Sequence, residues 1–193
     1  MKQDIHLPEP QKEGGLSLRE ALSARRSTRS YSTAQIPLQT LSNILWAGWG
    51  FSHGQGQLRT APSSHNRQEM ELYVFLPSGV YTYNAAANSL EQIFEEDLRR
   101  VTCVQEYAFE APLQIAMISD TSKITGKTPE GVIEAVSANA AYISENIYLA
   151  CAAEGLSTVA RLMIPLEDMR KALNLRPEQR ISIVQTIGYY KKA

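Results

Sequence analysis

The sequence predicts an α+β fold, because helical patterns and strand patterns follow one another in mixed order along the chain. Apolar residues recur at helical spacing in the stretches 17–26, 37–49, 129–155 and 165–173. Residues that favour strands fill the stretches 71–76, 80–83, 113–118, 157–160 and 181–187. The chain has 193 residues, of which 44% are hydrophobic. This size suits one domain over residues 16–193, with its own core.

Residues 1–15 are predicted to form an N-terminal arm. The stretch is polar, contains Pro8 and Pro10, and shows no helical period. It lacks the apolar region of a signal peptide, so the chain as given favours the cytoplasm. The periplasm is the alternative if an export signal precedes it in the natural protein.

The first predicted helix begins at a capping box. Ser17 and Glu20 have the Ser-x-x-Glu spacing, and Leu18, Ala21 and Leu22 supply a short apolar face. The helix is expected to end near residue 26, so the basic residues that follow lie at its C-terminal end, where the helix dipole favours cations.

A cluster of three arginines, Arg25, Arg26 and Arg29, surrounds the hydroxyl group of Ser27. Guanidinium groups at such spacing match the oxygens of a phosphate. The alternative is a solvated cluster on the surface, and the arginines alone do not decide between the two.

A loop of neutral polar residues lies between the predicted helix 37–49 and the predicted strand 71–76. Pro37 fits the first turn of that helix. The small hydroxyl and amide side chains of the loop can present many donors and acceptors to a polar ring edge or a sugar-alcohol chain. The residues concerned are Pro62, Ser63, Ser64, Asn66 and Gln68. An ordinary polar turn has a similar composition and is the alternative.

The middle of the chain is predicted to contain a hairpin, 71–76 and 80–83, joined at Pro77-Ser78-Gly79. A short helix is predicted over Glu95 to Val101, and the acidic run from Glu91 to Asp97 is interpreted as the solvated face of a helix.

The long helix 129–155 is predicted to be buried on most sides, because apolar residues occupy nearly its whole circumference. A homodimer with this helix near the two-fold axis would cover it, and a central helix in a monomer is the alternative. Cys103 and Cys151 both lie among apolar neighbours and are expected to be buried free thiols. A disulfide between them is the other possibility.

Four segments in order resemble the nitroreductase family of flavin mononucleotide (FMN) enzymes. They are Arg25-Arg26-Ser27-x-Arg29-x-Tyr31, the loop from Arg59 to Gln68, Glu154-Gly155-Leu156-Ser157-Thr158-Val159-Ala160-Arg161, and Ile187-Gly188-Tyr189-Tyr190-Lys191. The resemblance covers the chain from about residue 16 onward and is closest to the short branch that includes azoline and thiazoline oxidases. It implies a central, mostly antiparallel sheet flanked by helices, in an intertwined homodimer with FMN at the subunit interface.

The resemblance also implies a role for each matching residue. Arg25 and Ser27 would bind the phosphate and the ribityl chain, and Arg29 the pyrimidine edge. Arg26 belongs to the same basic motif and would also bind the cofactor. The loop containing Pro62, Ser63, Ser64, Asn66 and Gln68 would reach the flavin from the partner subunit. The backbone of Val159, Ala160 and Arg161 would lie near the flavin N5 atom. Lys191 would contact the phosphate, although the chain ends two residues later, where longer relatives continue to a further arginine.

The predicted function is two-electron reduction of a nitro, quinone or other small organic acceptor, with NADH or NADPH as donor, by a ping-pong mechanism. The alternatives are a flavin dehydrogenase or oxidase of a specific organic substrate that does not use nicotinamide, and a non-catalytic FMN-binding protein. No side chain is predicted as an obligatory catalytic residue, because the flavin carries the chemistry.

Several other site classes find no support in the sequence. The histidines show no metal-ligand spacing with cysteine or carboxylate, and neither a dinucleotide-binding fingerprint nor a nucleophile elbow is present. A net charge of -1 argues against nucleic acid and an anionic membrane as partners.

Overall fold

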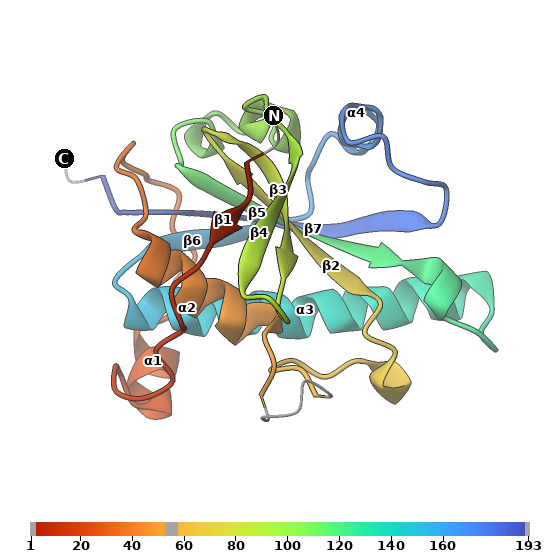
Figure 1. Ribbon diagram of the computed structural model, residues 1–193, viewed down its shortest axis with the longest axis horizontal. Helices are drawn as coiled ribbons and strands as arrows, with labels where there is room; N and C mark the ends of the chain where they lie inside the picture. Colours follow the sequence, from red (N-terminus) through yellow and green to blue (C-terminus); the bar gives the residue numbers. More distant parts are fainter. Residues whose placement is uncertain (1–2, 53–57, 192–193) are drawn as a thin grey trace.

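The computed structural model describes residues 3–52 and 58–191, which form a seven-stranded sheet with helices on both faces (Figure 1). Every neighbouring pair of strands is antiparallel, as predicted for most of the sheet. From one edge to the other the strands are β1 (Ile5–His6), β4 (Ser89–Phe94), β3 (Gly79–Asn84), β2 (Met70–Leu76), β5 (Leu113–Asp120), β7 (Gln179–Gly188) and β6 (Ser157–Arg161). The strand β6 therefore has one open edge.

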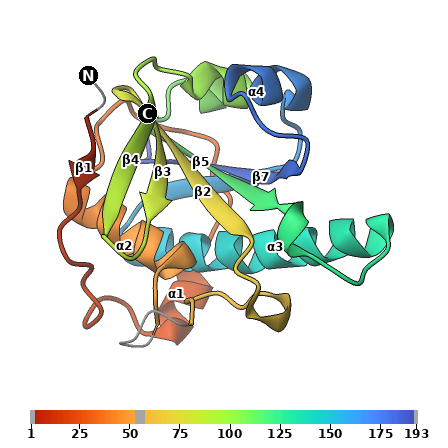
Figure 2. The same ribbon diagram turned by 45° about the vertical axis from the view of Figure 1, so that its right-hand side comes forward.

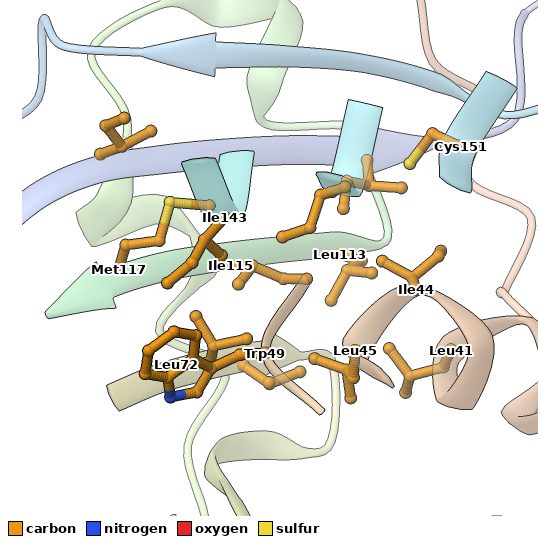
Figure 3. Close-up of a cluster of buried hydrophobic side chains, with 14 of the residues drawn as sticks. Leu41, Ile44, Leu45, Trp49, Leu72, Leu113, Ile115, Met117, Ile143 and Cys151 are labelled. Atoms are coloured by element: carbon orange, nitrogen blue, oxygen red, sulfur yellow. The ribbon is translucent and has the colours of Figure 1, made fainter. Parts of the chain in front are cut away.

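Two helices, α2 (Leu38–Trp49) and α3 (Pro129–Ala153), cover one face of the sheet (Figures 1 and 2). Side chains alternate between the two faces of a strand, so residues such as Leu72, Ile115 and Met117 point toward these helices. There they pack with Ile44 and Ile143 in the larger core (Figure 3). This layer fixes α3 beneath the sheet, and the candidate site is built around α3.

The opposite face of the sheet is covered by α4 (Leu166–Ala172) and the 3-10 helix η2 (Arg99–Thr102). Phe75 and Ala116 belong to the smaller core on this side, together with Met169 of α4. Shorter 3-10 helices are η1 (Ser64–Asn66), η3 (Glu106–Ala108) and η4 (Thr121–Lys123).

The first helix, α1 (Leu18–Ala24), begins at the predicted capping box. The Ser17 hydroxyl accepts a hydrogen bond from the Glu20 amide at 3.3 Å, and the Glu20 carboxylate accepts one from the Ser17 amide at 2.8 Å. The helix ends at Ala24, two residues earlier than predicted, and lies on the far side of α3 from the sheet (Figure 2).

The helices α2 and α3 also begin and end close to their predicted positions. Pro37 is the N-cap of α2 rather than a residue of its first turn. Pro129 is the first residue of α3. The N-cap is Thr128, whose hydroxyl accepts a hydrogen bond from the Gly131 amide at 3.2 Å. After α3, Gly155 has a φ of +67°, the left-handed conformation that glycine adopts readily just beyond a helix end.

The predicted helix over Glu95 to Val101 is wrong. The preceding residues form β4, which the sequence did not predict, and only η2 follows it. In β4, Leu90 and Gln92 are buried while Glu91 is exposed, which is the alternation of a strand. The acidic run from Glu91 to Asp97 is therefore not a helix face. Pairing with β3 overrode the local pattern.

The N-terminal arm lies against the rest of the chain. Its strand β1 pairs with β4 through Ile5 and Leu90. Further along, the Ser42 hydroxyl donates to the Pro8 carbonyl, and the Gln11 amide donates to the Asn43 side-chain oxygen at 2.9 Å. These contacts attach the arm to the sheet edge and to α2.

Cys103 and Cys151 are buried free thiols, as predicted. Burial raises the pKa of both thiols, which keeps them protonated. In the part of the chain that the structure describes, no helix is long and apolar enough to cross a membrane.

Candidate functional site

The arginine-rich segment, residues 25–31, lies along the open edge of β6. Its backbone forms a parallel bridge between Ser27 and Thr158, and the Thr28 amide donates to the Thr158 carbonyl at 2.9 Å. The Tyr31 hydroxyl closes the segment by donating to the Thr28 carbonyl at 2.7 Å. The edge of the sheet thus fixes the position of the segment.

The three predicted arginines have little compensating negative charge around them. The Arg25 guanidinium lies 5.3 Å from the centroid of the Tyr148 ring and 3.8 Å from the Glu145 carboxylate. Arg29 lies 6.0 Å from the Tyr107 ring centroid. Arg26 and Arg29 are exposed, and among the described residues neither has a carboxylate partner. The segment can therefore receive an anion.

The Ser27 hydroxyl meets a residue that the sequence analysis did not single out. It lies 2.9 Å from the hydroxyl of Tyr148, which also accepts a hydrogen bond from the Ala160 amide at 2.8 Å. In the sequence, Tyr148 is one of the apolar residues around the long helix, and their periodicity does not show where a phenol oxygen lies.

Two of the three predicted residues on β6 face the interior. Val159 is buried in a small cluster with Tyr31, and the Arg161 side chain is only 3% exposed. The Arg161 guanidinium donates inward to the Thr102 carbonyl at 2.8 Å and to the Gln114 side chain at 3.0 Å. Burial lowers the pKa of Arg161. Its side chain joins β6 to η2 and β5, so only its backbone can serve a ligand at the edge.

The loop from Pro62 to Gln68, here called the Pro62 loop, is closed by its own hydrogen bonds. The Ser63 hydroxyl accepts from the Gln68 amide at 3.0 Å, and the Asn66 amide donates to the Ser63 carbonyl at 2.9 Å. His65, Asn66 and Gln68 all have positive φ, between 49° and 55°. Left-handed backbone at three non-glycine residues costs conformational energy, and such strain is concentrated at functional sites.

A hollow of about 470 Å³ separates the Pro62 loop from the N-terminal half of α3. Ser63 and Ser64 line it from the loop, and Ala138, Asn139 and Tyr142 line it from the helix. The Asn139 amide nitrogen donates to the buried Glu69 carboxylate at 2.6 Å, which fixes the amide orientation and leaves its oxygen available.

The predicted phosphate contact Lys191 lies beside the arginine-rich segment. The Ser30 hydroxyl donates to the Lys191 carbonyl at 3.3 Å. The Lys191 ammonium group, however, pairs with Glu110 at 2.9 Å, and both side chains are more than half exposed. An exposed pair of this kind is weak and can be exchanged for a phosphate.

The arginine-rich segment and the Pro62 loop lie at different places along α3 (Figures 1 and 2). The segment contacts the helix near Tyr148, whereas the tip of the loop faces Ala138 and Asn139. Ten residues of α-helix separate Ala138 from Tyr148, or about 15 Å. The structure thus brings the arginines together with β6 and with Lys191, but not with the Pro62 loop of the same chain.

A further hollow, of about 640 Å³, lies elsewhere, beyond the end of α2 near Trp49, Arg59 and Tyr83. Burial raises the pKa of Tyr83 to about 12. Of the residues predicted to bind a cofactor, Gln68 alone lines this hollow, and its side chain accepts from the Arg59 guanidinium at 2.9 Å.

The groups along β6 fit FMN in their chemistry. Three guanidinium groups suit a phosphate, and hydroxyl groups suit a sugar-alcohol chain. The Thr28 hydroxyl oxygen is buried and has no hydrogen-bond partner among the residues that the structure describes, so the segment retains an unused polar group. Among the described residues no group of three histidine, cysteine or acidic side chains could hold a metal ion.

Comparison with known proteins gives three results that agree with one another. A model of the Nitroreductase family matches residues 22–189. A protein of Methanocaldococcus jannaschii described as a nitroreductase is 25% identical over 183 residues, which cover 90% of each chain. The crystal structure of a Ralstonia eutropha protein, also described as a nitroreductase, has a TM-score of 0.93 and 32% identity, and covers 98% of this chain and 90% of that one.

A more distant structure shares the fold. A Staphylococcus epidermidis protein described as an NAD(P)H:FMN oxidoreductase has a TM-score of 0.69 and 13% identity, and covers 95% of this chain and 92% of that one.

Proposed function

Because the chain belongs to the nitroreductase family and is an oxidoreductase, we propose that it uses FMN and NADH or NADPH to reduce a small organic acceptor. A nitro compound or a quinone is the acceptor class that the proposal names. The observation that carries it is the arginine-rich segment, which holds three guanidinium groups with little compensating charge along the edge of β6. The name of the Staphylococcus epidermidis structure, which includes both NAD(P)H and FMN, agrees with this choice of cofactor.

Each arginine has a separate task in this proposal. Arg25 and Arg26, with the Ser27 hydroxyl, hold the phosphate and the ribityl chain. Arg29, which is exposed next to Tyr107, holds positive charge near the pyrimidine edge. A fixed cation there stabilises a gain of negative charge and raises the two-electron reduction potential.

The FMN supplies the transfer of two electrons and a proton between donor and acceptor. The chain's own residues bind and orient the reactants, and no side chain is required as nucleophile, acid or base. The donor and the acceptor occupy the same open side of the site in turn, which predicts ping-pong kinetics.

The site is completed by a second copy of the chain in this proposal. Leu18 and Leu22 of α1 and Tyr142 of α3 are exposed by 66%, 53% and 50%, so they present apolar surface that a partner could cover. A homodimer that covers this surface would bring the Pro62 loop of one protomer to the arginine-rich segment of its partner. The separation of the two regions along α3 supports this arrangement.

An absorbance spectrum tests the proposal. The purified protein is mixed with FMN, desalted, and titrated anaerobically with NADH and then with NADPH. A retained flavin band that bleaches with either nucleotide is the expected result, and it identifies the donor. A retained band that neither nucleotide bleaches would instead indicate the azoline-type dehydrogenase or an FMN-binding protein. A folded protein that retains no flavin would overturn the proposal.

A further inference from the structure

One hydroxyl group, that of Tyr148, joins three elements that are far apart in the sequence. Tyr148 lies near the end of α3 and is 8% exposed. Its oxygen lies 2.9 Å from the Ser27 hydroxyl in the arginine-rich segment and accepts from the Ala160 amide of β6 at 2.8 Å. Ser27 and Tyr148 are 121 residues apart. The local sequence pattern of α3 gave no sign of this junction.

The ring of the same residue supports an arginine. The Arg25 guanidinium lies 5.3 Å from the Tyr148 ring centroid and 3.8 Å from Glu145, one turn earlier on α3. A guanidinium over a tyrosine face is held by the ring quadrupole. Tyr148 therefore contacts two residues of the proposed cofactor site, Ser27 through its hydroxyl and Arg25 through its ring.

The hydrogen bonds around Tyr148 have a favoured direction. The Ala160 amide can only donate, so the phenol oxygen accepts from it. A hydroxyl that accepts a hydrogen bond becomes a stronger donor, which favours donation of the phenol proton to Ser27. The Ser27 proton is then available to an acceptor outside the chain. The junction thus orders three donors in a chain: the Ala160 amide donates to the Tyr148 phenol, the phenol to the Ser27 hydroxyl, and the Ser27 hydroxyl to the outside acceptor.

We propose that Tyr148 is a positioning residue that fixes the Ser27 hydroxyl as a hydrogen-bond donor to an anionic or polyol oxygen of the bound ligand. This inference rests on the proposed function for the identity of that ligand. It assigns a role to a residue that the family resemblance did not mark, and it predicts that Tyr148 acts through Ser27.

A double-mutant cycle on FMN binding tests the coupling. Tyr148→Phe removes the hydroxyl but keeps the ring that supports Arg25, and Ser27→Ala removes the last donor. Ser27→Ala is expected to raise the Kd for FMN by about tenfold, because it removes the donor to a charged or polar ligand oxygen. Tyr148→Phe is expected to raise the Kd by a similar factor, about tenfold, because the Ser27 hydroxyl loses the partner that fixes it as a donor. The Kd of the double variant for FMN should be no higher than that of the single variant with the higher Kd. A Tyr148→Phe Kd within twofold of wild type, or fully additive losses, would overturn the inference.

A matched control separates binding from general stability. Tyr81 of β3 is also buried, and its hydroxyl lies 2.9 Å from that of Ser78 and 3.3 Å from the Gln92 amide nitrogen. Tyr81→Phe therefore removes a comparable buried hydroxyl away from the proposed site. It should lower Tm about as much as Tyr148→Phe and leave the Kd for FMN unchanged. Equal losses of FMN affinity in both variants would contradict a specific role for Tyr148.

A measurement on the protein without FMN keeps the inference separate from the proposed function. Tyr148→Phe should speed hydrogen exchange of the Ala160 amide by about tenfold or more, because that amide loses its acceptor. Unchanged exchange would overturn the positioning role. A wild-type protein that does not bind FMN would refute the proposed function alone, since the exchange measurement does not depend on the cofactor.

Discussion

The arginine-rich segment and the Pro62 loop hold their polar groups in position by different means. The segment takes its order from the sheet, through the bridge between Ser27 and Thr158 at the edge of β6. The loop takes most of its order from local contacts, through the hydrogen bond from the Gln68 amide to Ser63 and through left-handed residues such as His65. A change that loosens β6 should therefore affect the arginines, whereas a change within the loop should remain local.

The two regions also differ in what they offer a ligand. The segment presents guanidinium groups and suits an anion, while the loop presents neutral hydroxyl and amide groups beside a hollow of about 470 Å³. Charged hydrogen bonds are about twice as strong as neutral ones. The segment should consequently provide most of the affinity for FMN, and the loop should provide orientation.

The largest effect is expected from removal of the arginines. Arg29→Ala should raise the Kd for FMN by about 10- to 100-fold and slow its reduction, because a charged hydrogen bond to the ring edge is lost. Arg25→Ala should weaken FMN binding to a similar extent, with less effect on reduction at saturating donor. Fluorescence titration measures the Kd, and anaerobic stopped-flow absorbance measures the reduction rate.

Arg180→Ala is the matched control for both variants. Arg180 is exposed at the start of β7, far along that strand from the end that pairs with β6 near Thr158. It should bind FMN like the wild type. If Arg29→Ala leaves both affinity and reduction rate unchanged, the placement of Arg29 at the ring edge is wrong.

A mixture of two inactive variants tests whether the two regions act in one site across the subunit interface. One chain carries Arg25→Ala and Arg29→Ala, and the other carries Ser64→Trp, which fills the hollow beside the loop. Half of randomly formed dimers are mixed, and each mixed dimer has one site with both regions intact. Co-expression should therefore restore about a quarter of the wild-type FMN sites.

Purification on both tags selects the mixed dimers, so the doubly tagged protein should hold about one FMN per dimer, and the count of FMN per dimer measures this recovery. Two preparations of the separate variants, mixed only at the moment of assay, are the control and should show no recovery. A lack of recovery in the doubly tagged dimers would show that the two regions do not meet across the interface.

A smaller effect is expected from Tyr31→Phe, which tests how the arginine-rich segment depends on its closing hydrogen bond. Loss of the bond to the Thr28 carbonyl should cost about 1 kcal/mol of unfolding free energy at pH 7. Burial raises the pKa of Tyr31 in the folded protein, so the folded state binds the phenol proton more tightly than the unfolded state. The resulting stability is fully present below the ordinary tyrosine pKa and is lost as pH rises above about 10.

Urea unfolding at pH 7 and at pH 10.5 measures both consequences. Between these two pH values the wild type should lose more unfolding free energy than Tyr31→Phe does, because the variant lacks the titrating group. Tyr190→Phe changes an exposed tyrosine and should behave like the wild type at pH 7. Equal alkaline losses in wild type and Tyr31→Phe would contradict the role given to the buried phenol.

Most of the fold could be predicted from the sequence, because helix caps, turns and apolar periodicity depend on residues that are close together in the chain. The capping box at Ser17 and the glycine after α3 fixed helix ends to within two residues. The failure at Glu95 to Val101 has a physical cause. The acidic run that suggested a helix face begins inside β4, where pairing with β3 fixes a strand as far as Phe94, and only the short 3-10 helix Arg99–Thr102 forms after it.

The candidate site was predictable only in part. The arginines and the loop were found through residue types and order, which sequence shows directly. The Tyr148 hydroxyl and the inward direction of the Arg161 side chain depend on tertiary packing. Ser27 and Tyr148 are 121 residues apart in the sequence, and the spacing of residues does not predict a contact between side chains at that separation.

The smallest effect is expected at Arg59, where the Pro62 loop joins the end of α2. The Arg59 guanidinium donates to the Gln68 side chain at 2.9 Å and to the Trp49 carbonyl at 3.0 Å, and lies 4.1 Å from the Phe51 ring centroid. Lysine lacks the planar fork and cannot reproduce both bonds. Arg59→Lys should therefore loosen the loop and raise the Kd for FMN by only about two- to threefold, because the loop retains its internal hydrogen bonds.

Hydrogen exchange of the Gln68 amide measures the loosening, and fluorescence titration measures the Kd. Ser63→Ala, which removes the acceptor of that amide, is the internal reference and should speed its exchange more than Arg59→Lys does. If Arg59→Lys weakened FMN binding as much as Arg29→Ala, the loop would not be ordered by its own contacts. The affinity for FMN would then depend on the contact with the end of α2, and the description of the Pro62 loop as locally ordered would be wrong.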